Sequence, residues 1–184
     1  MARWQKTAPE GMGMSALGID PALGGDDKTV FARRHGPWYD ELVITPGKET
    51  VDPIQTAGRA IGLMRDGCTL VVDVIGIGSG CYSHLKQHVS AVNIVGLNVA
   101  EASSRRSRDG KYKFANKRSE MWWRFREALE PNLGEPVAPP PDQELLADLT
   151  APTFKLTSSG IVIESKDDIR KRLGRSTDKA DAVI

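Results

Sequence analysis

Four aspartates, in three short motifs spread along the chain, are the side chains best suited to chemistry. Asp20 and Asp73 each lie at the end of an apolar run that is typical of a buried strand. Asp178 and Asp181 lie three positions apart, which is the spacing of neighbours on one face of a helix. Carboxylates are seldom buried without partners, and hard divalent cations prefer clusters of oxygen ligands. If the fold brings these acids together, the pattern indicates a metal-dependent enzyme that acts on phosphates.

Two strands must position the first pair of acids. We expect strands over residues 15–20 and 69–74, with Asp20 and Asp73 near their carboxyl ends, where open α/β sheets collect their ligands. Adjacent strands place their ends about 5 Å apart, so the two carboxylates can share a cation. A third acid from the last helix would complete a site for two Mg²⁺ ions about 4 Å apart. Such a pair can activate a water molecule and neutralise charge on a phosphate.

The remaining elements predict a mixed α/β sheet with helices on both faces, because hairpin strands come first and helices and strands then alternate. Asp52-Pro53 is a helix-opening pair, and we expect Ile54 on the buried stripe of that helix and Gly67 at its end. Residues 98–113 lack apolar periodicity and predict a mobile loop or ribbon. The further strands are expected at about 29–34, 38–45, 92–97, 154–157 and 161–164, and the further helices at about 81–89, 116–130, 143–150, 166–173 and 177–184.

Length and composition favour a single cytosolic domain. The chain has 184 residues, of which 40% are hydrophobic and 27% charged, and no apolar stretch approaches the roughly 20 residues that span a bilayer. Residues 1–14 predict a linker or an expression remnant without a signal peptide, and residues 15–184 the domain itself. Cys68 and Cys81 are too few for a disulfide framework, so we expect reduced thiols.

Positive charge is concentrated locally although the net charge is only +1. A first cluster has one acid, Asp109, among seven basic residues, which are Arg105, Arg106, Arg108, Lys111, Lys113, Lys117 and Arg118. A second cluster comprises Lys166, Arg170, Lys171, Arg172 and Arg175. In a nuclease the first cluster would follow a duplex backbone through phosphate contacts, which confer affinity without sequence choice.

Two other motifs suggest ligands but fit them poorly. The glycine-rich segment 76–80 lacks the spacing of a dinucleotide fingerprint, so we interpret it as a tight turn that lets backbone amides approach a phosphate. Cys81, His84 and His88 share one helical face at metal-ligand spacing, but no fourth ligand is evident. We therefore expect these three side chains to be partly buried helix residues.

Four segments in order resemble the nuclease domain of the phage terminase large subunit, over roughly residues 15–184. They are GIDPALGGDDKTV, VVDVIGIGSG, FANKRSEMWWRFREALE and IVIESKDDIRKRLGRSTDKADAVI. The resemblance implies a ribonuclease H-like fold and an enzyme that trims packaged viral DNA. It places the family's metal-binding carboxylates on Asp20, Asp73 and Asp181, with Asp178 as a fourth acid. Lys166 matches a family lysine close to the catalytic edge.

The resemblance also implies partners and a cofactor. We expect an endonuclease that uses two Mg²⁺ or Mn²⁺ ions on double-stranded DNA, with little sequence preference, in the host cell cytoplasm. The Walker A pattern of the ATPase motor is absent from this sequence, so we expect the motor on a preceding segment or a separate polypeptide. The portal and the small terminase subunit are further partners that the family implies, and no membrane is involved.

Alternative functions remain open from the sequence. Another ribonuclease H-like nuclease, such as a junction resolvase or a transposase core, would use the same acids. A non-catalytic module would instead keep the acids for structure and dock DNA or a packaging partner through its basic clusters. An actin-like nucleotide-binding fold would need a second matching domain, for which 184 residues leave no room.

Overall fold

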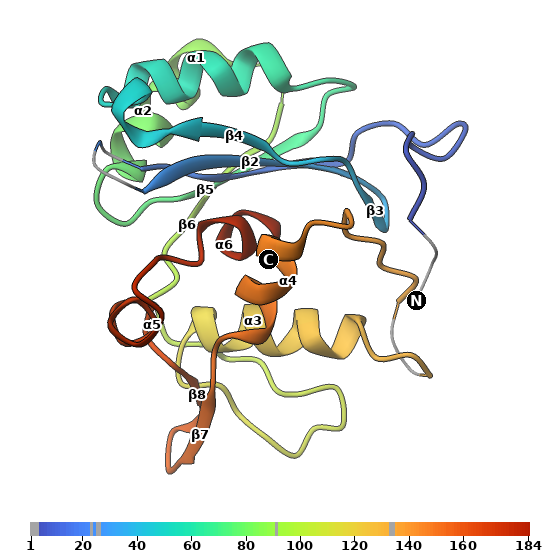
Figure 1. Ribbon diagram of the computed structural model, residues 1–184, viewed down its shortest axis with the longest axis vertical. Helices are drawn as coiled ribbons and strands as arrows, with labels where there is room; N and C mark the ends of the chain where they lie inside the picture. Colours follow the sequence, from blue (N-terminus) through green and yellow to red (C-terminus); the bar gives the residue numbers. More distant parts are fainter. Residues whose placement is uncertain (1–3, 23, 25–26, 91, 133–134) are drawn as a thin grey trace.

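A mixed sheet forms the centre of the molecule in the computed structural model, which describes residues 4–22, 24, 27–90, 92–132 and 135–184 (Figure 1). The strands are, in spatial order, β3 (Trp38–Tyr39), β2 (Lys28–His35), β1 (Ala16–Asp20), β5 (Thr69–Asp73) and β6 (Ile94–Leu97), with β4 (Val43–Pro46) also paired to β2. β1 runs antiparallel to β2 and parallel to β5, which is parallel to β6. The predicted α/β class with a mixed sheet is confirmed.

The register of β1 and β5 places the first two acids at one edge. Ile19 lies opposite Val72 in the parallel pair, so Asp20 and Asp73 follow directly on neighbouring strands. β1 ends at Asp20, directly before Pro21, and β5 ends at Asp73. The expected meeting of the two strand ends is therefore confirmed.

Two helices cover one face of the sheet, α1 (Pro53–Leu63) and α2 (Gly78–His88), as Figure 1 shows above the strands. Asp52 caps α1 by accepting a hydrogen bond from the amide of Ile54, and Pro53 occupies the first turn as predicted. Sheet residues such as Leu17 and Leu70 are fully buried beneath these helices, in a core cluster that α1 and α2 share. Two details of the prediction for α1 were wrong. Ile54, expected on the buried stripe, is 54% exposed, and the helix ends at Leu63 and not at Gly67.

The other face carries α6 (Asp178–Val183), with α4 (Gln143–Thr150) and α3 (Lys117–Ala128) beyond it. α6 approaches β1 so closely that a Cβ atom at Gly18 would lie 2.1 Å from the carbonyl oxygen of Ala182. Only glycine fits at that position. Two adjacent tryptophans of α3 are both buried in different clusters, Trp122 toward the sheet and Trp123 against Phe114.

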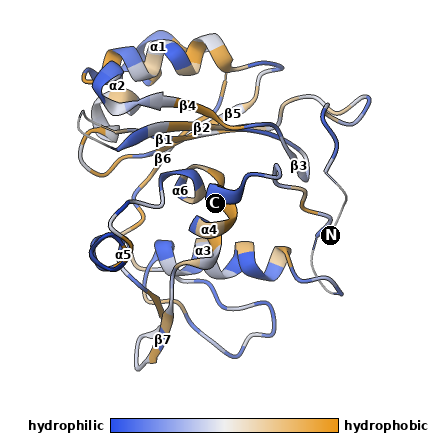
Figure 2. Cartoon of the chain, viewed as in Figure 1, coloured by the Kyte–Doolittle hydropathy of each residue, from blue (hydrophilic) through white to orange (hydrophobic). Residues whose placement is uncertain are grey.

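A hairpin and a short helix complete the fold. β7 (Phe154–Thr157) pairs with β8 (Gly160–Ile163) beside α3, and α5 (Lys166–Leu173) follows directly. The hydroxyl of Ser119 on α3 accepts a hydrogen bond from the amide of Ile163, at 3.0 Å. This contact holds the end of the hairpin near the sheet edge, where α5 begins. Figure 2 shows that α5 is hydrophilic, whereas hydrophobic residues concentrate on the strands.

Three other expectations were tested by the structure. The strand predicted over 38–45 is divided into β3 and β4, followed by a 3-10 turn, η1 (Gly47–Glu49). The segment 98–113 has no helix or named strand but contains an isolated bridge between Arg106 and Lys113. Both cysteines are free and buried. Within the described ranges, no helix is long and apolar enough to cross a membrane.

Candidate functional site

Asp20 ends β1 inside the molecule. The residue is only 7% exposed, and its Oδ2 atom lies 3.2 Å from the ammonium of Lys166. Burial raises the pKa of Asp20 to about 8, and nearby Asp181 and Asp178 add to this effect while Lys166 opposes it. A carboxyl group with this pKa gains a proton far more readily than an exposed aspartate.

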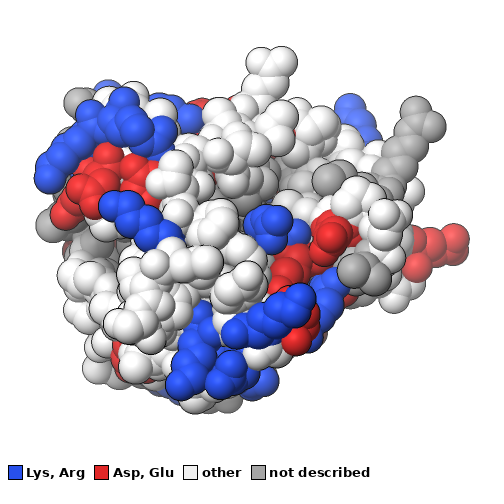
Figure 3. Space-filling view, turned by 90° about the horizontal axis from the view of Figure 1, so that it is seen from below, with Lys and Arg blue, Asp and Glu red and all other residues white. Residues whose placement is uncertain are grey.

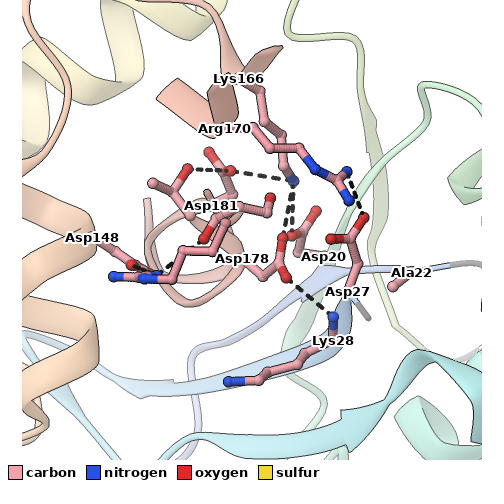
Figure 4. A network of polar contacts seen from close by, with 12 residues as sticks. Asp20, Ala22, Asp27, Lys28, Asp148, Lys166, Arg170, Asp178 and Asp181 are labelled. Atoms are coloured by element: carbon pink, nitrogen blue, oxygen red, sulfur yellow. Dashed lines mark hydrogen bonds and ion pairs between the residues drawn. The ribbon is translucent and has the colours of Figure 1, made fainter. Parts of the chain in front are cut away.

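Lys166 lies at the centre of three carboxylates, as Figure 4 shows. Its Nζ atom is 3.2 Å from Asp20, 3.3 Å from Asp181 and 3.5 Å from Asp178. Burial alone would lower the pKa of this lysine, but the three acids outweigh it and raise the pKa above its ordinary value. The side chain as a whole is still 41% exposed, although its ammonium lies among the acids.

The two acids of α6 face the same point from one turn of helix, as their spacing predicted. Asp181 accepts hydrogen bonds from Arg118 at 2.9 Å and from the hydroxyl of Thr177 at 3.0 Å. Burial acts to raise the pKa of Asp181, but Lys166 and Arg118 lower it overall. Asp178 accepts from the backbone amide of Lys28 at 3.1 Å.

Asp73 belongs to the same site but has a different local partner. Its Oδ1 atom accepts a hydrogen bond from the amide of Ile75, at 3.0 Å, in the turn that leads into α2. That turn requires glycine at position 78, because a Cβ atom there would lie 1.6 Å from the carbonyl oxygen of Asp73. Burial raises the pKa of Asp73, partly offset by its bond to Ile75 and by Lys166.

A cavity of about 390 Å³ joins these groups. Asp20, Asp73, Asp181 and Lys166 line its polar end, and α3 supplies Arg118 with apolar side chains beyond it. Asp178 lies behind this lining and reaches the site through Lys166. The four predicted acids and the predicted lysine are therefore gathered in one place.

Arg118 was predicted as part of the basic DNA-binding cluster, and the structure places it inside the acidic site. Its Nη1 atom binds Asp181, and its guanidinium lies 5.4 Å from the ring centre of Trp122. The Nε and Nη2 atoms are buried without a hydrogen-bond partner among the described residues. No spacing in the sequence distinguishes Arg118 from the other basic residues of its cluster.

The rest of the basic cluster lies on the side of the molecule that carries α3 and the hairpin. Figure 3 shows Lys and Arg groups on this face with acidic side chains beside several of them. Lys117 pairs with Glu101 at 2.6 Å, and Lys111 lies 3.5 Å from Asp109. The positive charge is therefore partly compensated locally.

The present arrangement centres on an ammonium. Across the part of the chain that the structure describes, no group of three or more His, Cys, Asp or Glu side chains is placed to hold a metal ion. The chemistry of the donors still suits a hard cation, because three carboxylates already surround one positive centre. Of the three side chains expected to be partly buried on α2, only His84 is: Cys81 is fully buried and His88 is exposed, and the two histidine rings stack with their centres 4.0 Å apart.

Comparison with solved structures identifies the fold, whereas neither protein-family models nor curated proteins gave a match. The nuclease domain of the large terminase subunit of bacterial virus Sf6 superposes with a TM-score of 0.72 at 18% identity, covering 94% of this chain and 86% of that one. A variant of that domain with manganese gives a TM-score of 0.70 at 17% identity, covering 98% and 88%. The large terminase nuclease of thermophilic phage G20c with magnesium gives 0.58 at 18% identity, covering 99% and 90%. The chain has the ribonuclease H-like fold of these domains.

Proposed function

We propose that this chain is the nuclease domain of a viral DNA-packaging terminase large subunit and hydrolyses phosphodiester bonds of duplex DNA. The observation that carries the proposal is the convergence of Asp20, Asp178 and Asp181 on one cationic centre, with Asp73 in the same cavity. A fold match that covers 94% of the chain supports a nuclease framework for the site. Burying acids this close together destabilises the fold, because each negative charge makes ionisation of the next acid less favourable.

Two Mg²⁺ or Mn²⁺ ions are the proposed cofactors, in agreement with the manganese and magnesium bound by the compared domains. Asp20, Asp73 and Asp181 would hold them, with Asp178 assisting. When bound, the ions neutralise charge on the phosphate and activate water for the displacement. The protein contributes a fixed set of oxygen ligands at the end of a rigid sheet.

Lys166 must leave the centre of the carboxylates before a cation can occupy it, because two positive charges would repel at that distance. Its partial exposure permits this movement. Displaced toward solvent, the ammonium can orient or neutralise the scissile phosphate. Arg118 has two donor atoms, Nε and Nη2, without a partner among the described residues, and it is the second cation suited to that phosphate.

The basic cluster is the proposed surface for the DNA backbone. Its contacts would be to phosphates, which accounts for the proposed lack of sequence preference. In the assembled packaging machine the domain would work with an ATPase motor, the portal and the small terminase subunit in the host cell cytoplasm. The six residues of this surface are Arg105, Arg106, Arg108, Lys111, Lys113 and Lys117, whereas Arg118, the seventh member of the predicted cluster, belongs to the acidic site.

Substitution of Asp73 tests the proposal. Asp73→Asn keeps the size of the side chain and an acceptor for the amide of Ile75, so we expect an unchanged fold. Loss of one ligand charge should abolish Mn²⁺-dependent nicking of plasmid DNA, measured on gels, with circular dichroism as the control for folding. Equal nicking by the variant and the wild type would reject the mechanism.

A non-catalytic DNA-binding module is the second candidate, favoured by the central position of Lys166. In that case the ammonium would be a permanent structural counter-ion for the acids, and no described ligand group is ready for a metal. DNA binding that is independent of metal, with no cleavage at any Mn²⁺ concentration, would support the module.

A further inference from the structure

The side of α6 that faces away from the acids carries a buried lysine. The side chain of Lys179 is 8% exposed, and its Nζ atom lies 2.6 Å from Asp142 and 2.9 Å from Glu144. Both acids belong to the start of α4, where Asp142 also caps the helix by accepting from the amide of Leu145. Burial acts to lower the pKa of Lys179, but these two acids raise it overall, so the lysine is charged at neutral pH.

Further hydrogen bonds connect these contacts back to α6 itself. Glu144 also accepts from the ammonium of Lys28 at 2.8 Å, and the backbone amide of Lys28 donates to Asp178 at 3.1 Å. Asp178 is the neighbour of Lys179 on α6. These contacts therefore connect Asp178 through Lys28 of β2 and Glu144 of α4 to Lys179, on the same turn of α6.

Such support is needed because α6 is very short. It has six residues, its N-cap Thr177 makes no capping hydrogen bond with its side chain, and isolated helices of this length are unstable in water. The position of α6 thus depends on its tertiary contacts. The apolar side chains of α6 set its distance from the sheet, but an apolar contact is not directional and fixes rotation poorly. A buried ion pair is directional and specifies one orientation.

We propose that Lys179 is a positioning residue for the metal-binding acids: held by Asp142 and Glu144, it sets the orientation of α6 and so the placement of Asp178 and Asp181. The inference rests on the proposed metal-dependent function. Lys179 touches neither substrate nor metal and acts through the helix. Supporting groups of this kind typically change metal affinity by about 10- to 100-fold when they are removed.

The test compares Mn²⁺ affinity by titration calorimetry in folded protein. Lys179→Met should weaken Mn²⁺ binding by about tenfold or more, and Lys179→Arg should restore affinity to within about threefold because it can bind both acids. The Mn²⁺ concentration for half-maximal cleavage should shift in parallel, while the KM for DNA stays unchanged.

A second variant covers the case in which Lys179→Met does not fold. Asp142→Asn with Glu144→Gln removes both counter-charges, and asparagine remains a good helix cap, so α4 should persist. Arg33→Met is the matched control, because it breaks a partly buried pair with Asp40, 2.7 Å long, that involves no residue of α4 or α6. The control should lose stability without a change in Mn²⁺ affinity.

The outcomes separate the inference from the proposed function. If wild-type protein binds no Mn²⁺ and cuts no DNA, the proposed function fails. If wild-type protein binds Mn²⁺ and the Lys179→Met and Asp142→Asn/Glu144→Gln variants bind it equally well, the positioning role is overturned. A loss of affinity that Lys179→Arg does not restore would also count against it, because the loss would then not depend on the positive charge.

Discussion

The ammonium of Lys166 lies where three carboxylates converge, at distances between 3.2 and 3.5 Å. An ammonium in that position satisfies the acids electrostatically and keeps them from repelling one another. It also competes with any other cation for the same oxygens. The charge balance of the site, more than the number of its ligands, should therefore control metal binding.

Removal of this lysine should reveal the competition. Lys166→Met leaves the acids without their central counter-ion, so the metal-free protein should lose about 1–2 kcal/mol, less than for a fully buried pair because the side chain is 41% exposed. Mn²⁺ should bind more tightly and raise the melting temperature more than in the wild type. Scanning calorimetry with and without Mn²⁺ measures both effects. Weaker Mn²⁺ binding by the variant would mean that Lys166 helps to assemble the metal site.

The raised pKa of Asp20 gives the site a pH dependence of defined sign. Because folding raises this pKa, the native state binds more protons than the unfolded state at any pH between the unfolded-state and folded-state pKa of Asp20. Asp20 therefore contributes stability at low pH that is lost as pH rises through its folded-state pKa. Metal binding has the opposite trend, since a ligand carboxylate must be ionised. Mn²⁺ affinity should increase from pH 6 to pH 8, by at most about tenfold per unit for one proton. Asp20→Asn should flatten the stability profile over this range, and a flat affinity profile in the wild type would contradict the argument.

At the scale of elements, the strand ends were predictable and the position of α6 was not. An acid near the end of an apolar run is a local signal, and it located both Asp20 and Asp73. Where α6 lies depends on packing between β1 and a helix more than 150 positions later, and only the resemblance to terminase nucleases brought these acids together. The close approach at Gly18 has no local signature, because a glycine within a strand also marks bulges and bends.

The contact between β1 and α6 can be tested at that glycine. Gly18→Ala places a methyl group 2.1 Å from the carbonyl oxygen of Ala182, so α6 must move. We expect a loss of about 1–3 kcal/mol in urea unfolding, together with weaker Mn²⁺ binding because Asp178 and Asp181 move with the helix. Gly58→Ala is the control: it lies exposed within α1 with open space around it and should stabilise the protein by about 0.5–1 kcal/mol. Similar stabilities for the two variants would show that α6 adapts without cost.

For the whole molecule, the two faces of the sheet have different roles. α1 and α2 seal one face with the main apolar cluster, whereas the acids, α3 and the basic cluster gather on the other side. The basic cluster could be found in the sequence, because closely spaced positive residues are recognisable without knowledge of the fold. The separation of Arg118 from its neighbours could not be predicted, because Asp181 lies 63 positions away and only the folded chain pairs them.

DNA binding by the remaining cluster should depend on salt more than on sequence. Arg105 and Lys113 are exposed on the segment beside α3, so replacing both with alanine should weaken duplex binding uniformly across sequences. The dependence of log affinity on log salt should fall by about one for each phosphate that the variant no longer binds, measured by fluorescence anisotropy without divalent metal. Lys86→Ala on α2 is the control, since α2 lies on the opposite face of the sheet and its loss should leave both quantities unchanged. If the double variant keeps the wild-type salt dependence while Lys86→Ala lowers it, the duplex lies against the α1 and α2 face. The proposed DNA-binding surface would then be wrong.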